Sequence, residues 1–230
     1  LLVIINAKMT NIIGIDLGTT FSAIASLDDL GNSEVLTSIE DNRKITASAI
    51  YVDGKKVVVG DKALNFIAKE PNKVILQTKR EMENDVVYSI AEGKWTNEKD
   101  NVESYTPAQV SALILKKLKE YTSGVTKAVI TVPAMFAERA RQATLEAAKM
   151  ADIEVIELIN EPTAAVLHYA SLPGVEIGGR VLIFDLGGGT FDVTIAEVKS
   201  KSVDVLTSRG DKYLGGKDFY PSPPTSLLIQ

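Results

Sequence analysis

Two short segments of this chain combine an aspartate with a run of glycine and threonine, a combination suited to binding phosphate. The first reads IIGIDLGTTF over residues 12–21, and the second reads VLIFDLGGGTF over residues 181–191. Small residues would let backbone amides and threonine hydroxyls approach phosphate oxygens, while the carboxylates of Asp16 and Asp185 would face a magnesium ion and its waters. Two such turns facing each other would clamp one triphosphate.

The repetition of this segment argues against an accidental match. Taken alone, Gly18-Thr19-Thr20 reads equally well as an ordinary hairpin turn. Each copy is an apolar strand, a tight polar turn and a second strand, which predicts a β-hairpin. The internal repeat therefore predicts two homologous lobes, each opening with such a hairpin.

Two other nucleotide-binding signatures do not fit this chain. The P-loop pattern GxxxxGK[ST] occurs nowhere in it. The run from Gly187 to Gly189 imitates the start of a dinucleotide-binding fingerprint, but Asp192 stands where its last glycine belongs. The residues that follow alternate as a strand does, so a dinucleotide-binding domain is disfavoured.

Composition limits the possible partners. The 230 residues are 45% hydrophobic, enough for one large globular domain or two small ones, and the net charge is −5. This acidic balance argues against binding to nucleic acid or to an anionic membrane. The absence of cysteine excludes disulfides and thiolate metal sites and fits the cytoplasm. The apolar run at residues 1–5 is too short to span a membrane and lacks the basic stretch of a signal peptide.

The segment between the two hairpins predicts a βαβ unit. Residues 127–133 read as a buried strand, 137–151 as an amphipathic helix and 153–159 as a second, parallel strand. Upstream, Thr106 is a predicted helix cap with Pro107 at the first helical position. That helix places apolar residues on one face and should cover the same sheet.

Residues 38–105 are charged and less periodic, which predicts a smaller insert on the first lobe. Within it we expect a helix at 61–69 and strands at 47–52 and 86–90. Trp95 is interpreted as a local packing residue of this insert. His168 lies on the helix expected after Pro162, and a structural role is favoured because the chain has no second histidine for a metal site.

Taken together, these motifs resemble the DnaK-type heat-shock protein 70 chaperones, within the actin and sugar-kinase fold group. The matching segments are IGIDLGTTFS at 13–22, TKR at 78–80, ITVPAMF at 130–136, RQAT at 141–144, INEPTAA at 159–165 and IFDLGGGTFDV at 183–193. The resemblance implies an α/β, actin-like ATPase (ribonuclease-H-like) fold with a complete first lobe and a partial second lobe. The expected division is a non-native or disordered leader at 1–8, a first lobe at 9–175 with its insert at about 38–105, the start of a second lobe at 176–219 and an aberrant tail at 220–230.

The same resemblance assigns roles to individual residues. Nucleotide binding is implied for Gly18, Thr19, Thr20, Phe21, Gly187, Gly188, Gly189 and Thr190, all but Gly18 and Phe21 as phosphate contacts. A hydrated Mg²⁺ is implied for Asp16 and Asp185. The implied catalytic residues are Lys79, which would position the attacking water, and Glu161, Asp185 and Asp192, in the network of metal and water. Without the resemblance, Lys79 reads as part of a solvated face and Glu161 as a carboxylate favoured by a helix start.

The family also implies ligands and partners. These are ATP or ADP with Mg²⁺, unfolded client peptides held by a further domain, a J-domain co-chaperone and a nucleotide exchange factor. The implied activity is ATP hydrolysis that drives peptide binding and release. Pro133 and Arg141 resemble the pair through which the family couples nucleotide state to its neighbouring domain.

The chain departs from the family after residue 219, where the expected motif appears as GGKDF and gives way to a proline-rich tail. The adenosine-binding residues and the peptide-binding domain are expected beyond that point. We therefore expect weak or absent ATP hydrolysis, and aggregation through the incompletely covered strands at 181–184 and 193–196. Two alternatives stay open, an actin-like or sugar-kinase relative and a catalytically dead fragment.

Overall fold

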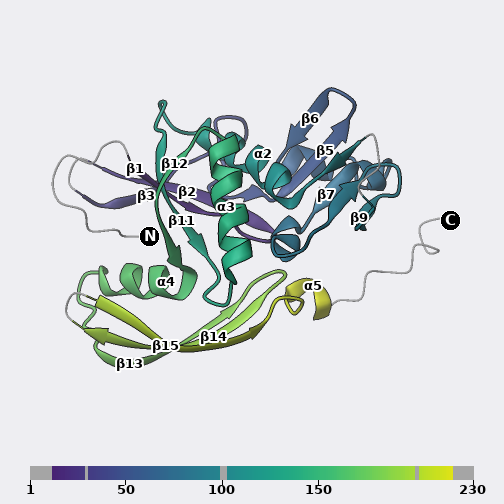
Figure 1. Ribbon diagram of the computed structural model, residues 1–230. Coiled ribbons are helices and arrows are strands. Elements are labelled where there is room, and N and C mark those ends of the chain that lie inside the picture. Colours follow the sequence, from purple (N-terminus) through teal and green to yellow (C-terminus); the bar gives the residue numbers. More distant parts are fainter. Residues whose placement is uncertain (1–11, 29–30, 99–102, 200–201, 220–230) are drawn as a thin grey trace.

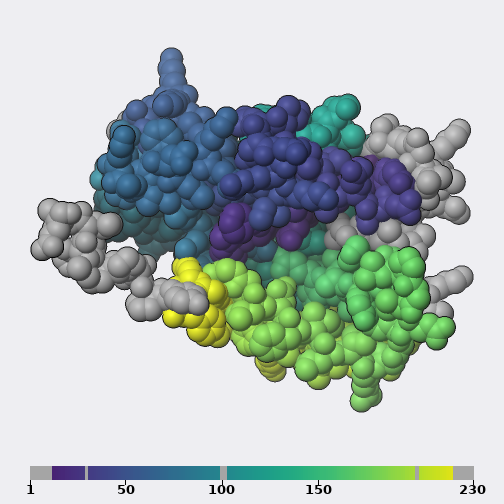
Figure 2. Space-filling model, turned by 180° about the vertical axis from the view of Figure 1, so that it is seen from behind, coloured from purple at the N-terminus to yellow at the C-terminus, as the bar shows by residue number. Residues whose placement is uncertain are grey.

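The computed structural model describes residues 12–28, 31–98, 103–199 and 202–219. The predicted leader at 1–8 and the predicted tail at 220–230 lie outside these ranges. The described residues form a mixed sheet flanked by helices and a separate antiparallel sheet, with helix α4 between them (Figure 1). In the view from behind, the C-terminal part of the described chain lies along one side of the molecule and the N-terminal part along the other (Figure 2).

The main sheet contains the first hairpin and the predicted βαβ unit. Its strand order is β12-β11-β1-β2-β3, and β4 also pairs with β2. Strands β1, β11 and β12 run parallel, and β1 and β2 form the antiparallel hairpin. The bounds of these strands are Ile12–Asp16 (β1), Phe21–Leu27 (β2), Ser33–Val35 (β3), Thr46–Ala47 (β4), Lys127–Val132 (β11) and Glu154–Asn160 (β12).

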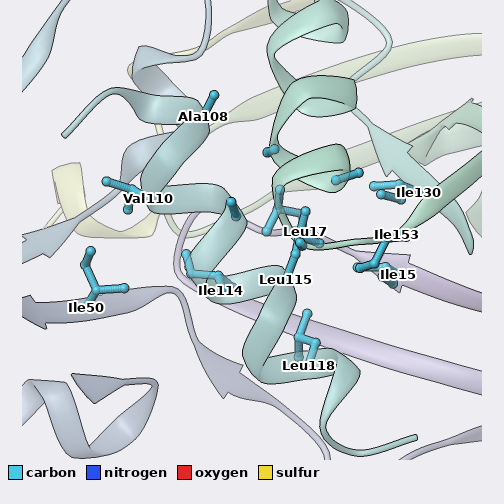
Figure 3. Close-up of a cluster of buried hydrophobic side chains, with 14 of the residues drawn as sticks. Ile15, Leu17, Ile50, Ala108, Val110, Ile114, Leu115, Leu118, Ile130 and Ile153 are labelled. Atoms are coloured by element: carbon cyan, nitrogen blue, oxygen red, sulfur yellow. The ribbon is translucent and has the colours of Figure 1, made fainter. Parts of the chain in front are cut away.

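Two helices, α2 (Pro107–Lys119) and α3 (Glu138–Met150), pack together and supply much of the core (Figure 3). The start of α2 is a capping box, in which the Thr106 hydroxyl accepts from the Gln109 amide and the Gln109 side chain accepts from the Thr106 amide. The core lies where α2 meets the sheet, and its fully buried side chains include Ile15, Leu115, Leu118 and Ile130.

The range predicted as an insert contains two small sheets. One has the order β6-β5-β7 and the other β10-β8-β9. Their bounds are Ala49–Asp53 (β5), Lys56–Val59 (β6), Val74–Leu76 (β7), Val87–Ser89 (β8), Lys94–Thr96 (β9) and Ser104–Tyr105 (β10). Trp95 packs edge-on against Tyr88, at 5.4 Å between ring centroids, as a local packing residue should.

The helix expected at 61–69 is much shorter than predicted. Helix α1 covers only Asp61–Leu64, and the following residues continue as turns with i→i−3 hydrogen bonds. Its N-cap is Gly60, which has no side chain to accept a hydrogen bond from the first turn of the helix. The Phe66 ring stacks on Tyr51 of the small sheet at 3.8 Å, so tertiary packing and not helix propensity shapes this segment.

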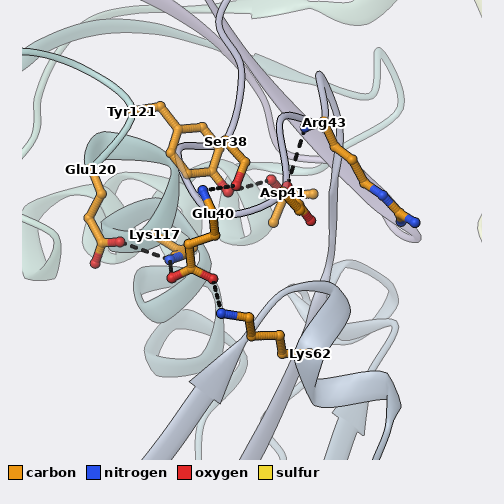
Figure 4. A network of polar contacts seen from close by, with 9 residues as sticks. Ser38, Glu40, Asp41, Arg43, Lys62, Lys117, Glu120 and Tyr121 are labelled. Atoms are coloured by element: carbon orange, nitrogen blue, oxygen red, sulfur yellow. Dashed lines mark hydrogen bonds and ion pairs between the residues drawn. The ribbon is translucent and has the colours of Figure 1, made fainter.

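A polar network ties the loop before β4 to both α1 and α2 (Figure 4). Glu40 forms ion pairs with Lys62 at 2.7 Å and with Lys117 at 2.6 Å, and Lys117 also pairs with Glu120. Hydrogen bonds from these two lysines lower the pKa of Glu40 to about 2. The network therefore links the loop before β4 to the helix that carries the core.

The second sheet has the order β13-β14-β15 and contains the second hairpin. Its strands are Gly179–Leu186 (β13), Phe191–Lys199 (β14) and Ser202–Asp211 (β15). Every second residue along these strands faces helix α4 (Glu161–Ala170). On the opposite face of the sheet, the side chains of Leu182 and Phe184 are each 66% exposed. Within the described ranges, no helix is both long and apolar enough to cross a membrane.

Candidate functional site

A cavity of about 490 Å³ lies where the two hairpin turns meet. Strand β1 ends at Asp16 on one side of it, and strand β13 carries Asp185 on the other. The cavity is lined by Asp16, Gly18, Thr19, Thr20, Phe21, Lys79, Thr131, Glu161, Ala164, Ala165, His168, Asp185, Gly187, Gly188 and Thr190. All the predicted site residues except Gly189 and Asp192 are in this lining.

Two buried serines fix the first turn. Ser22 accepts from the Gly18 amide at 3.1 Å, and Ser48 donates to the Gly18 carbonyl at 2.7 Å. The two hydroxyls are 2.9 Å apart and hydrogen-bonded to each other. A β-carbon on Gly18 would lie 2.0 Å from the carbonyl oxygen of Phe21, so only glycine fits this bend.

The second turn sits directly against the first. A β-carbon on Gly188 would lie 2.1 Å from the Thr20 hydroxyl, and one on Gly189 would lie 2.4 Å from a methyl group of Thr19. The Gly187 amide donates to the Thr190 carbonyl at 2.9 Å, which closes the turn. The close approach of the two turns therefore requires glycine at positions 188 and 189.

Lys79 brings a positive charge into this acidic cavity. It lies in the short 3-10 helix η2 (Thr78–Glu81) and forms a buried ion pair with Glu161, the first residue of α4. Burial lowers the pKa of Lys79, but the Glu161 and Asp16 charges outweigh burial and raise it overall. Burial also raises the pKa of Glu161 to about 7, against the opposing effect of Lys79. Three carboxylates thus share one lysine, and the cavity has a deficit of positive charge.

Asp192 lies beside Asp185 across the second hairpin, so both side chains point to the same face of the sheet. Burial raises the pKa of each carboxyl group, and the Asp185 charge raises the pKa of Asp192 further. Asp192 is buried and is not among the residues that line the cavity. One of its carboxylate oxygens and the Thr19 hydroxyl are buried polar atoms with no hydrogen-bond partner among the described residues.

Sequence reasoning missed several residues of the cavity wall. Thr131 pairs with Asp16 in the parallel ladder, and its hydroxyl lies 3.3 Å from the Asp16 carboxylate. The side chains of parallel strands in register share a face, so this placement could have been inferred. His168 also lines the cavity, because α4 turns the same face inward at Glu161, Ala164 and His168.

Arg141 supports the cavity from outside it. Its guanidinium donates to the Asn160 side chain at 2.6 Å and to the Phe136 carbonyl at 3.2 Å. Asn160 immediately precedes Glu161, and Pro133 is buried at the end of β11. Arg141 therefore connects the start of α3 to the start of α4.

The donor groups of the cavity set limits on a bound cation. Across the residues that the structure describes, no group of three or more His, Cys, Asp or Glu side chains is placed to hold a metal ion. Asp16 and Asp185 could hold a divalent cation with water completing its shell, as Mg²⁺ prefers. Such a cation would also correct the deficit of positive charge, so these residues fit a hydrated magnesium ion.

A mixed α/β fold in which two Asp-Gly hairpin turns line one cavity is the arrangement that the sequence predicts for a phosphate clamp, and comparison with known proteins identifies the family. The Hsp70 protein family model matches residues 12–221, so the chain belongs to the Hsp70 family. Membership implies the actin-like ATPase fold that the sequence predicts. The match also favours the chaperone hypothesis over an actin-like or sugar-kinase relative.

Individual relatives carry the name chaperone protein DnaK. Those of Thermotoga petrophila, Thermotoga neapolitana and Thermotoga maritima are each 40% identical to this chain over 220 residues. The aligned segment covers 92% of this chain and 35% of each relative. The chain therefore spans about a third of the length of the curated relatives that it matches.

Proposed function

We propose that this chain is the nucleotide-binding part of a DnaK-type chaperone and holds Mg-ATP or Mg-ADP between its two hairpin turns. The observation that carries this proposal is that one cavity is lined by both turns and also by Lys79 and three carboxylates. Family membership supports it, because DnaK chaperones are Hsp70 proteins.

Each group has a proposed task. The amides and hydroxyls of the turns, centred on Thr19, Thr20 and the segment 187–190, contact the phosphates. Bound magnesium would neutralise phosphate charge, with Asp16 and Asp185 holding its water shell. Lys79 orients the attacking water, and Glu161 holds Lys79 in place and accepts hydrogen bonds from water.

The buried Asp192 has a supporting task in this proposal. Its charge lies next to Asp185, so the ionisation of the two carboxyl groups is coupled. A divalent cation near Asp185 would favour the ionised form of both. Asp192 therefore adjusts the charge of the metal site without lining the cavity.

ATP turnover and the chaperone cycle are proposed for a protein of the relatives' length. In that protein, hydrolysis would control the binding and release of unfolded peptides, with a J-domain protein and a nucleotide exchange factor as partners. A cytoplasmic location is proposed with them, and it fits the absence of cysteine. For the present chain alone we propose weak nucleotide binding, because family resemblance places the nucleoside contacts outside it.

Calorimetric titration of the chain with Mg-ATP tests the phosphate clamp. Gly188→Ala should weaken binding at least about tenfold, because its β-carbon would press on the Thr20 hydroxyl and hold the two turns apart. Gly178→Ala is the matched control, since its β-carbon would meet nothing closer than 4.0 Å. No detectable binding of Mg-ATP even at millimolar concentration, or equal binding by both variants, would contradict the proposal.

A further inference from the structure

The second hairpin turn is held from behind by donors that reach all three of its glycine carbonyls. The Gly216 amide donates to the Gly187 carbonyl at 2.9 Å, and the Lys217 amide donates to the Gly188 carbonyl at 3.1 Å. The third carbonyl, that of Gly189, accepts from the Arg80 Nε at 2.6 Å. Two of these donors are backbone amides, so Arg80 is the only side chain of the three.

Arg80 is held in a fixed orientation for this contact. It follows Lys79 in helix η2 and is 7% exposed. Its terminal nitrogen donates to Asp218 at 2.6 Å, and Asp218 also accepts from the Gly215 amide at 2.9 Å. The guanidinium lies 5.9 Å from the ring centroid of Tyr213. Because a guanidinium is planar and rigid, fixing one nitrogen fixes the other.

Holding the carbonyls has a geometric consequence for the amides. In a trans peptide unit the C=O of one residue and the N–H of the next point in opposite directions. Carbonyls tied to α5 (Gly216–Phe219) and Arg80 therefore turn the amides of Gly188, Gly189 and Thr190 the other way. Gly188 and Thr190 line the cavity, so this orientation presents N–H groups to an anion and keeps carbonyl oxygens away from it.

We propose that Arg80 is a positioning residue of the phosphate-binding turn. By holding the Gly189 carbonyl, it orients the Thr190 amide toward bound phosphate and keeps the second turn against Thr19. The inference rests on the proposed function, because it assumes that the turn binds a polyphosphate. It adds a residue that lies outside the cavity lining and acts through the backbone.

The test uses Mg²⁺ with inorganic tripolyphosphate, which carries the phosphates without a nucleoside. Arg80→Met should weaken its binding about tenfold, equivalent to the loss of one charge-assisted hydrogen bond. Arg80→Lys should lose most of the same affinity, because an ammonium group cannot reproduce the planar fork. Arg139→Met is the control, since Arg139 is exposed and pairs with Asp85 on the surface at 3.6 Å.

Hydrogen exchange separates positioning from general destabilisation. In the Arg80 variants, exchange should accelerate at the hydrogen-bonded amides of the turn and its support, those of Gly187, Gly216 and Lys217, while the β14–β15 ladder keeps its protection. Undiminished tripolyphosphate binding, or equal loss of protection in turn and ladder, would overturn the inference while leaving the phosphate clamp standing. If Arg80→Met does not fold, Arg80→Lys decides the question by the same two measurements. Failure of the unaltered chain to bind tripolyphosphate would instead contradict the proposed function, and the inference with it.

Discussion

Lys79 is the one Lys or Arg among the described lining residues of the cavity, and its charge acts on Glu161, Asp16 and Asp185. Its ion-pair partner is Glu161, and the same lysine charge also acts on the two aspartates, so three carboxylates share one cation. This excess of negative charge destabilises the cation-free chain and favours binding of a divalent cation. The acidic residues that suit the site to a cation therefore also lower the unfolding free energy of the chain without one.

Lys79→Ala should lower the rate of ATP hydrolysis by about a hundredfold or more while changing Mg-ATP affinity much less, because a group that orients water acts mainly in the transition state. The comparison is made by single-turnover hydrolysis and calorimetry in a protein of the relatives' length. Lys44→Ala, at an exposed lysine, is the control. Equal losses in rate and affinity would make Lys79 a binding residue instead.

Glu161 predicts a pH dependence of stability. Burial raises its pKa from 4.5 to about 7, so the folded chain holds this proton more tightly than the unfolded chain. The resulting stabilisation is complete below the unfolded pKa of 4.5 and is lost as pH rises through about 7. Glu161→Gln should reduce the fall in unfolding free energy between pH 5 and pH 8, by up to about 3 kcal/mol.

Urea unfolding of the cation-free chain at both pH values measures this fall. Exposed Glu157 on β12 supplies the control variant Glu157→Gln. A pH dependence unchanged by Glu161→Gln would show that this carboxyl group does not titrate as an isolated buried acid. Asp185 and Asp192, whose pKa values are also raised, keep part of the dependence in either variant.

At the scale of elements, local patterns predicted the two hairpins, helix α2 and the βαβ unit to within a few residues. Their signals lie within each segment: alternation in β14, the Thr106-Pro107 start of α2, and the apolar strand before each turn. The predicted extent of the helix at 61–69 was wrong because Phe66 packs on Tyr51, a contact between residues distant in sequence. The contact of Ser48 with the first hairpin was missed for the same reason.

Thr106→Ala tests the contribution of a cap to its element. Loss of the capping box should reduce the unfolding free energy by about 1 kcal/mol, because the Gln109 amide loses its acceptor. Thr126→Ala is the control, since exposed Thr126 uses its backbone carbonyl to bind the Glu154 amide and alanine keeps that bond. Equal stability of Thr106→Ala and the unaltered chain in urea would show that the α2 start is held by packing alone.

At the scale of the whole molecule, one face of the second sheet is apolar and exposed. Leu182 lies opposite Ile195 and Phe184 opposite Val193, and the Phe184 and Phe191 rings are 4.8 Å apart. A contiguous apolar face on an antiparallel sheet favours association between molecules. We therefore expect aggregation through the strands at 181–184 and 193–196 to occur at this apolar face.

Phe184→Lys should raise the concentration at which the chain begins to associate, because a charge in the centre of the face opposes stacking of two sheets. Light scattering against protein concentration makes the measurement. Ile39→Lys is the control, because Ile39 is 81% exposed but lies on the first part of the molecule. An equal effect of both lysines would assign the change to net charge and not to this face.

The central claim is that both hairpin turns bind one polyphosphate. Its most direct test is titration of the isotope-labelled chain with Mg-ATP, following the backbone amide resonances of residues 18–20 and 187–190. We predict that both sets shift together and fit one dissociation constant, while amides of the β5–β7 sheet do not move. Shifts confined to one turn, or two different dissociation constants for the two turns, would contradict the claim.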